Sequence, residues 1–135
     1  MTHTHPLRVY YEDTDAGGIV YHANYLKFCE RARSEWVRGL GIDQRALKAE
    51  QGLIIVVRRM EVDFLRPALY DDALSVTTRL RALGGARIEL DQAVLRGPET
   101  LFTASVILVC VGPDGRAARL PDDLRQRLQP ASQTG

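Results

Sequence analysis

A chain of 135 residues with a formal net charge of +1 has the length of one compact domain. Eighteen Lys and Arg balance seventeen Asp and Glu, so no charge excess points to nucleic acid or a membrane surface as partner. The only cysteines, Cys29 and Cys110, lack CxxC spacing and a nearby histidine cluster, which argues against a disulfide framework and a structural zinc site. The composition favours a cytoplasmic protein that binds a small molecule or another protein.

The N-terminal segment, MTHTHPLRVYYED, has neither the apolar core nor the cleavage site of a signal peptide. No apolar run reaches the roughly 20 residues that a membrane helix needs. We expect His3 and His5 to lie in a disordered arm rather than to bind a metal. The alternation of LRVYYE predicts the first strand over residues 7–12, with its apolar residues on one face.

Two helices are predicted next. From about residue 22 to residue 40 apolar side chains recur at intervals of three and four, which indicates an amphipathic helix of about five turns. Gly39 and Gly41 end it, and Asp43 caps a short second helix over residues 44–50 that Gly52 terminates. The predicted core stripe of the long helix, in which Cys29 is an inert buried thiol, comprises Tyr25, Phe28, Cys29, Ala32, Trp36 and Leu40.

The remainder is rich in strands. Segments 53–65, 73–83, 87–96 and 101–111 read as strands, and the short turns between the last three favour an antiparallel meander of all four. The polar tail from Asp122 is expected to have frayed last residues. The element order predicts an α+β fold in which one antiparallel sheet curves around the long helix. Because such a sheet leaves its edges unprotected, we expect a homodimer.

The stretch DTDAGGIVYHANYL, residues 13–26, carries the candidate chemistry. One interpretation is an ordinary turn and helix cap. The other is an oxyanion site, in which the free N–H groups of about Tyr21 and His22 at the helix start stabilise negative charge on a carbonyl oxygen. Asp15 would then attack that carbonyl or activate a water. The chain lacks a GxSxG motif and a Walker motif.

The run VYYEDTDAGGIVYHANYLKFCERARSEWVRGLG, residues 9–41, resembles the signature of the 4-hydroxybenzoyl-CoA thioesterase family, and within it the branch of Tol-Pal-associated acyl-CoA thioesterases. The segment VDFLRPALYDDAL is also similar, and the resemblance covers about residues 7–120. It implies a single hotdog domain over residues 1–135, with a long helix wrapped by a five- or six-stranded antiparallel sheet. It also implies a homodimer, often assembled into a homotetramer.

The resemblance assigns roles to particular residues. Asp15 matches the catalytic aspartate, either as nucleophile or as general base. Tyr21 matches the position whose backbone N–H polarises the thioester carbonyl, and His22 a histidine that assists by positioning or proton transfer. The implied activity is hydrolysis of a small to medium acyl-CoA, with no metal and no redox cofactor.

Residues expected to bind the substrate complete the site. Gly18 lies in the loop and Tyr25 at the helix start, where it can line the acyl pocket, and Phe64 can border the acyl or pantetheine channel. Core packing is the simpler interpretation for both aromatic residues. Arginines suit the phosphates of coenzyme A, though scattered surface arginines are equally ordinary. These arginines are Arg58, Arg59, Arg66, Arg79, Arg81 and Arg87, of which we favour the first two.

Three further alternatives stay open. Glu30, Arg31 and Arg33 of the ERAR segment form either a solvated helix face or an ion pair at a subunit interface. A protein of the same fold can bind acyl groups without turnover, serving an acyl carrier protein or a Tol-Pal-linked complex. A hydratase acting on enoyl-CoA is the third possibility.

Overall fold

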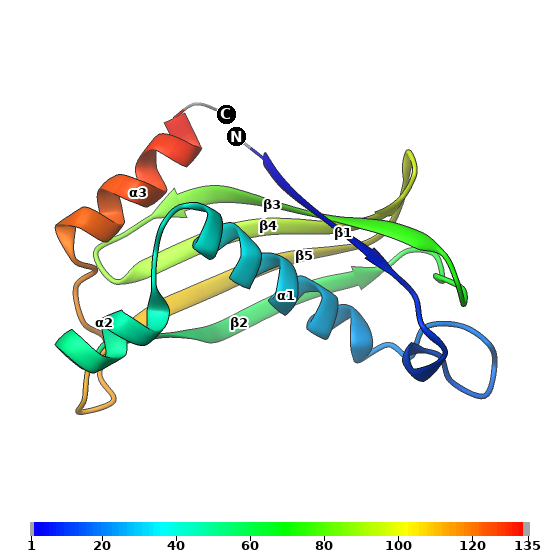
Figure 1. Cartoon of the computed structure of the whole chain (residues 1–135), viewed down its shortest axis with the longest axis horizontal. Helices are drawn as coiled ribbons and strands as arrows, with labels where there is room; N and C mark the ends of the chain where they lie inside the picture. Colours follow the sequence, from blue (N-terminus) through cyan, green and yellow to red (C-terminus); the bar gives the residue numbers. More distant parts are fainter. Residues whose placement is uncertain (1, 134–135) are drawn as a thin grey trace.

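The computed structural model describes residues 2–133 and shows one antiparallel sheet curving around a long helix (Figure 1). The predicted α+β class is confirmed. None of the helices in these residues is long and apolar enough to cross a membrane. The strands are β1 (Thr2–Arg8), β2 (Ile54–Phe64), β3 (Ala73–Leu83), β4 (Arg87–Arg96) and β5 (Glu99–Val111), and the helices are α1 (Asn24–Gly39), α2 (Gln44–Gln51) and α3 (Asp122–Gln133), with a short 3₁₀ turn over Tyr11–Asp13.

The strand order in the sheet is β1-β3-β4-β5-β2, and every neighbouring pair is antiparallel. Strands β3, β4 and β5 form the predicted meander. The expectation that β2 joins this meander beside β3 is wrong, because β2 pairs with β5 at the far edge. The link over residues 65–72 therefore crosses the ends of two strands, β5 and β4. The three inter-strand spacings amount to roughly 14 Å, which eight residues span easily.

The first strand lies earlier than predicted. It covers Thr2–Arg8 and pairs with β3, so His3 and His5 belong to an ordered edge strand rather than to a disordered arm. Pro6 is tolerated there because an edge strand can leave one N–H position unused. Residues 9–12 fail to continue the strand because the Tyr10 N–H donates to Asp13 Oδ2 at 2.8 Å, which turns the chain into the 3₁₀ helix.

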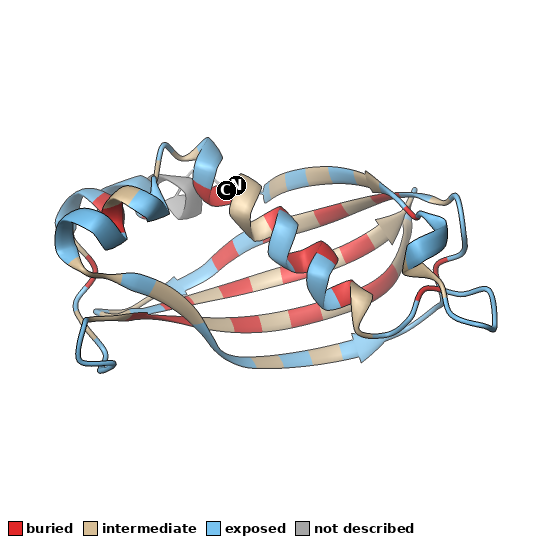
Figure 2. Cartoon of the chain, turned by 60° about the horizontal axis from the view of Figure 1, so that its bottom comes forward, coloured by how far each residue is buried: buried red, intermediate tan, exposed pale blue. Residues whose placement is uncertain are grey.

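Helix α1 buries its predicted stripe against the sheet, and Figure 2 shows its buried positions facing the strands. Five of the six stripe residues are buried, and Leu40 packs against the core while remaining partly exposed. Helix α2 is confirmed with its cap: the Asp43 side chain accepts from two backbone N–H groups, and Gly52 ends the helix with a φ of 67°. The core lies between α1 and the inner face of the sheet.

Helix α3 was not predicted. Its residues Leu124 and Leu128 are buried in the same core as α1, together with Leu120 just before the helix. Three leucines spaced by four residues are the signal that the polar surroundings of this tail obscured. The expected fraying of the last residues concerns positions 134–135, which lie outside the described residues.

Candidate functional site

A cavity of about 350 Å³ opens where β2 ends and α1 begins. Three segments form its walls: the loop before α1, the first turn of α1, and the chain that follows Phe64. The structure therefore brings together four residues that the sequence singled out, which are Asp15, His22, Tyr25 and Phe64. The other lining residues are Ile19, Val20, Leu65, Arg66 and Pro67.

The loop that carries Asp15 is closed by its own hydrogen bonds. The Asp15 backbone N–H donates to Ile19 O at 2.9 Å, and the Gly18 backbone N–H donates to Asp15 O at 3.0 Å. Gly18 has a φ of 79°, a left-handed conformation that glycine adopts without strain. The Gly17 N–H donates to Asp15 Oδ1 at 2.8 Å. One carboxylate oxygen is thus oriented by the loop, and no residue that the structure describes donates to the other.

The backbone N–H groups at the helix start differ in what they contact. The Tyr21 N–H donates to Asp13 O at 2.9 Å, and the Asn24 side chain donates to the same oxygen at 2.8 Å. The expectation that Tyr21 N–H meets the substrate is therefore not supported, because this group already has an acceptor. The His22 N–H donates to no acceptor among residues 2–133. The sequence pointed to this N–H together with that of Tyr21.

Aromatic side chains form the inner wall. The Tyr25 ring stacks on Phe102 with centroids 5.0 Å apart, and Phe64 contacts both rings edge to face. The His22 ring meets Phe64 at 6.2 Å. The Phe64 side chain is half exposed at the end of β2, as a residue bordering a channel should be. These contacts join the first turn of α1 to the ends of β2 and β5.

Tyr25 also fixes the backbone of the link over residues 65–72. Its hydroxyl oxygen accepts from Ala68 N–H at 2.9 Å, and Val20 N–H donates to Ala68 O at 2.9 Å. Burial raises the pKa of Tyr25, against the opposing effect of the Ala68 hydrogen bond, so the side chain stays a neutral phenol at physiological pH. One buried residue of the link, Ala68, thereby ties helix, loop and link together.

A second set of contacts holds the far end of this link. Asp72 Oδ2 accepts from Leu69 N–H and from Arg96 Nη1, each at 2.8 Å, and Arg96 also pairs with Glu99. Burial disfavours charge on the Asp72 carboxylate, but the Leu69 N–H and the Arg96 guanidinium outweigh it and hold its pKa below the usual range. The wall formed by Leu65, Arg66 and Pro67 is thus anchored at both ends.

The two favoured arginines lie away from this cavity. Arg58 sits at the register shift of β2, and Arg59 pairs with Glu61 on the same strand. Neither lines the cavity, whereas Arg66 does and also pairs with Glu99 at 3.1 Å. The other three candidates, Arg79, Arg81 and Arg87, form ion pairs with the β4 carboxylates Glu89 and Asp91. The position of Arg66 two residues after Phe64 was the available signal.

Within residues 2–133, no group of three or more His, Cys, Asp or Glu side chains is placed to hold a metal ion. Cys29 and Cys110 are buried free thiols, and burial raises the pKa of Cys29 to about 11. A thiol with that pKa is a poor nucleophile, as the sequence predicted for Cys29.

Comparison with known proteins places this geometry in a family. The sequence profile of the thioesterase-like superfamily matches residues 9–128. The acyl-CoA thioester hydrolase YbgC of Escherichia coli O6:H1 is 46% identical over 109 residues, which are 80% of this chain and 81% of that protein. The acyl-CoA thioesterase YbgC of Haemophilus influenzae is 47% identical over 106 residues, 78% of each chain.

Solved structures agree with this assignment. A probable thioesterase from Bartonella henselae superposes with a TM-score of 0.85 at 42% identity, covering 90% of this chain and all of that one. The region that matches the family, residues 9–128, includes the loop that carries Asp15 and strands β2 to β5. The chain belongs to the thioesterase-like superfamily and has its hotdog fold.

Proposed function

We propose that this chain hydrolyses the thioester of small to medium acyl-CoA molecules to a free acid and coenzyme A. One observation carries the proposal: Asp15 and His22 line the same apolar cavity. Within residues 2–133, one Asp15 carboxylate oxygen accepts no hydrogen bond and the His22 backbone N–H has no acceptor. The names of its relatives, acyl-CoA thioester hydrolase and acyl-CoA thioesterase, support the choice of substrate class.

The proposed chemistry uses only these groups and water. The thioester oxygen docks on the His22 N–H and the positive end of the α1 dipole, which stabilise the negative charge that develops on it. The Asp15 carboxylate either attacks the carbonyl carbon, forming an anhydride that water then opens, or removes a proton from the attacking water. The C–S bond breaks, and the thiolate of coenzyme A takes up a proton. No metal or redox cofactor is needed in either route.

A second copy of the chain is part of the proposal. Strand β2 has 11 residues and no neighbour on its outer edge within the described structure, and Ile54 and Val57 on it are exposed. Long edge strands of this kind are a ready surface for pairing. We expect a homodimer joined along β2, with a homotetramer as a further assembly. An acyl carrier protein or Tol-Pal-linked partner and a cytoplasmic location stay predictions.

The test is thiol release from acyl-CoAs ranging from short aliphatic to long and aromatic, with an Asp15→Asn variant in parallel. We expect the parent to release thiol and the variant to lose about 10²- to 10⁴-fold in kcat, the usual contribution of a general base. Asp63→Asn, on the exposed part of β2 and outside the cavity, is the matched control. Full activity in Asp15→Asn would refute the site, and no thiol release in the parent would favour an acyl-binding protein.

A further inference from the structure

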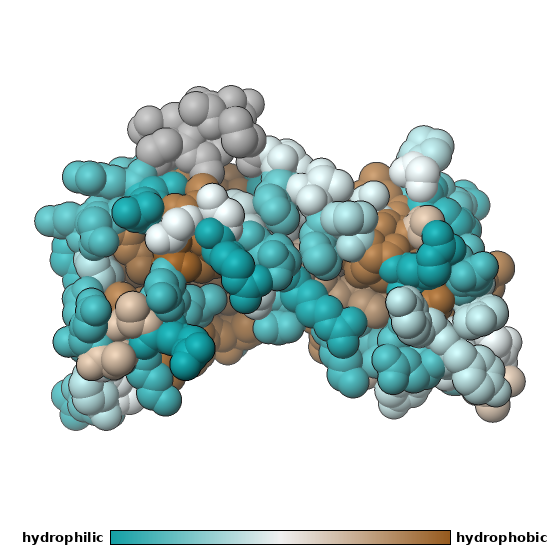
Figure 3. Space-filling model, in the orientation of Figure 1, coloured by the Kyte–Doolittle hydropathy of each residue, from teal (hydrophilic) through white to brown (hydrophobic). Residues whose placement is uncertain are grey.

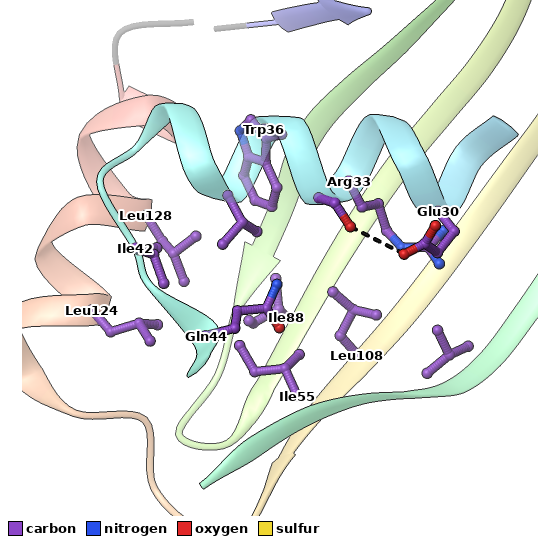
Figure 4. A pocket seen from close by; sticks show the side chains of 13 residues that line it. Glu30, Arg33, Trp36, Ile42, Gln44, Ile55, Ile88, Leu108, Leu124 and Leu128 are labelled. Atoms are coloured by element: carbon purple, nitrogen blue, oxygen red, sulfur yellow. Dashed lines mark hydrogen bonds between the residues drawn. The ribbon is translucent and has the colours of Figure 1, made fainter. Parts of the chain in front are cut away.

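A second cavity lies at the opposite end of β2, beneath the C-terminal half of α1 (Figure 4). Its volume is about 170 Å³, close to that of an engineered cavity of roughly 150 Å³ that binds benzene. Helices α1 and α3, the corner before α2, and strands β2, β4 and β5 contribute to it. Its apolar walls include Val37, Ile42, Ile55, Ile88, Leu108 and Leu128.

One positively charged side chain lines this apolar space. The sequence left Arg33 as part of a solvated helix face or an interface ion pair, but its guanidinium is half buried and lines the cavity. Arg33 Nη1 donates to Gln92 Oε1 at 3.0 Å, whereas Arg31 of the same segment is exposed. Burial lowers the pKa of Arg33, since desolvation disfavours its charged form.

The partner of Arg33 is rigidly held. Gln92 is buried, and its Nε2 donates to Cys29 O at 3.0 Å and to Thr78 Oγ1 at 2.9 Å. Both amide hydrogens are thereby used, which fixes the side-chain oxygen toward Arg33. A buried hydrogen-bonded network of this kind holds the guanidinium in one place rather than leaving it free to move.

The Glu30 carboxylate attracts the Arg33 guanidinium only from beyond ion-pair distance. Arg33 forms no ion pair within 4.0 Å in the described part of the chain, and only one of its five N–H donors has an acceptor there. Glu30 lines the same cavity, but its carboxylate accepts from the Ser34 hydroxyl at 3.1 Å instead. A partly buried guanidinium with unused donors beside an apolar cavity matches a carboxylate that carries a hydrocarbon group.

We propose that this cavity binds a small carboxylic acid, with its hydrocarbon group of about benzene size against the apolar walls and its carboxylate on Arg33. Nothing else in the cavity offers an unpaired positive charge among the described residues. A free acid is also what thioester hydrolysis releases, so the further identification of this ligand as a product of the reaction rests on the function proposed above. The binding itself does not depend on that function.

The experiment uses the only tryptophan of the chain as its reporter. Trp36 lines the cavity, and Figure 4 shows its ring directed into it. Benzoate and hexanoate, titrated into the intact protein, should change the Trp36 fluorescence with a Kd on the order of 1 mM, as ligands of this size can supply. The neutral amides of the same acids should bind at least about tenfold more weakly, because a charged hydrogen bond is lost.

Variants separate this cavity from the site at Asp15. Arg33→Gln should weaken benzoate binding by about tenfold or more, whereas Glu30→Gln should strengthen it, because a nearby negative charge is removed. Ile42→Phe should fill the cavity and abolish binding, and Asp15→Asn should leave the titration unchanged. Equal affinities for acid and amide, no fluorescence change, or an unchanged Arg33→Gln variant would each overturn the proposal. If thiol release fails while these titrations succeed, only the proposed function is lost.

Discussion

Backbone geometry at single residues determines how the candidate site is arranged. Asp15 is oriented because Gly17 N–H donates to its side chain and Gly18 adopts a positive φ that closes the loop. The free donor is His22 N–H rather than Tyr21 N–H because Asp13 O already accepts from Tyr21 and from Asn24. A hydrogen bond within the loop thus decides which N–H group can meet a substrate.

Gly18→Ala tests this loop. A side chain at a φ of 79° costs about 1–2 kcal/mol, although no atom lies within 4 Å of the added Cβ. We expect lower stability by that amount in urea unfolding, and a lower kcat because relaxation of the strain moves Asp15. Gly39→Ala is the control: it has ordinary helical geometry and equal space, and should be stabilising by about 0.5–1 kcal/mol. Equal effects of the two substitutions would contradict the argument.

Asp72 gives the site a predictable response to acid. Its pKa is lower when folded than the ordinary value of about 3.9, so its ionisation stabilises the fold above that pH and the contribution is lost as pH falls through the folded pKa. Asp72→Asn should therefore lower the urea midpoint at pH 7 and reduce the further loss of stability below about pH 4. Urea unfolding at several pH values checks this, with Asp63→Asn as control, and parallel curves for Asp72→Asn and the parent would refute it.

At the scale of elements, β1 and α3 differ from the sequence-based prediction for the same reason. Strand β1 contains two histidines and a proline, and α3 is mostly polar, yet both form because each packs on a neighbour distant in sequence. Strand β1 pairs with β3 over seven residues, and α3 inserts two leucines into the core. Figure 1 shows α3 at the end of the sheet where α1 terminates, and β1 beside β3.

Leu128→Ala tests whether α3 belongs to the core. The side chain is 1% exposed, so its truncation should lower the free energy of unfolding by about 2–5 kcal/mol. Gln126→Ala, exposed on the same helix, should change it by no more than about 0.5 kcal/mol. Thermal or urea unfolding of both variants measures this difference, and a Leu128→Ala variant as stable as the control would mean that α3 is not packed on the core.

At the scale of the whole molecule, one strand edge and some apolar side chains are exposed to solvent instead of being covered by the rest of the described chain. Within residues 2–133 the outer edge of strand β2 is unpaired. Figure 3 shows apolar side chains reaching the surface at the end of the molecule that carries α2. The two cavities lie at opposite ends of β2, next to Phe64 and Ile55 respectively. A partner copy along β2 would cover the edge between them.

The proposed dimer makes a prediction about mass. Light scattering should give about 30 kDa, twice the 15.1 kDa of one chain. Neighbouring backbone N–H groups of a strand point to opposite edges. Of the two variants Met60→Pro and Glu61→Pro, one therefore removes an N–H that faces β5, and this variant should lose a hydrogen bond to β5 and unfold more easily. The other should keep its hydrogen bonds to β5 and become monomeric. A monomeric parent, or two variants that remain dimers, would exclude pairing along β2.

The sequence by itself determined the elements whose signals are local. The stripe of α1 repeats every three or four residues, Asp43 and Gly52 mark both ends of α2, and the bounds of β3 and β4 follow from alternation and turns. Likewise, the cluster of Asp15, His22, Tyr25 and Phe64 was foreseeable because a specific motif and the strand after it contain these residues.

Only the tertiary structure decided what depends on contacts between distant segments. The place of β2 beside β5 follows from a link that crosses the sheet, and α3 forms because two leucines find the core. Arg33 is half buried because Gln92, 59 residues away, accepts its hydrogen bond. Local periodicity reports which face of an element is apolar, but it carries no information about which distant partner that face or its polar neighbours will meet.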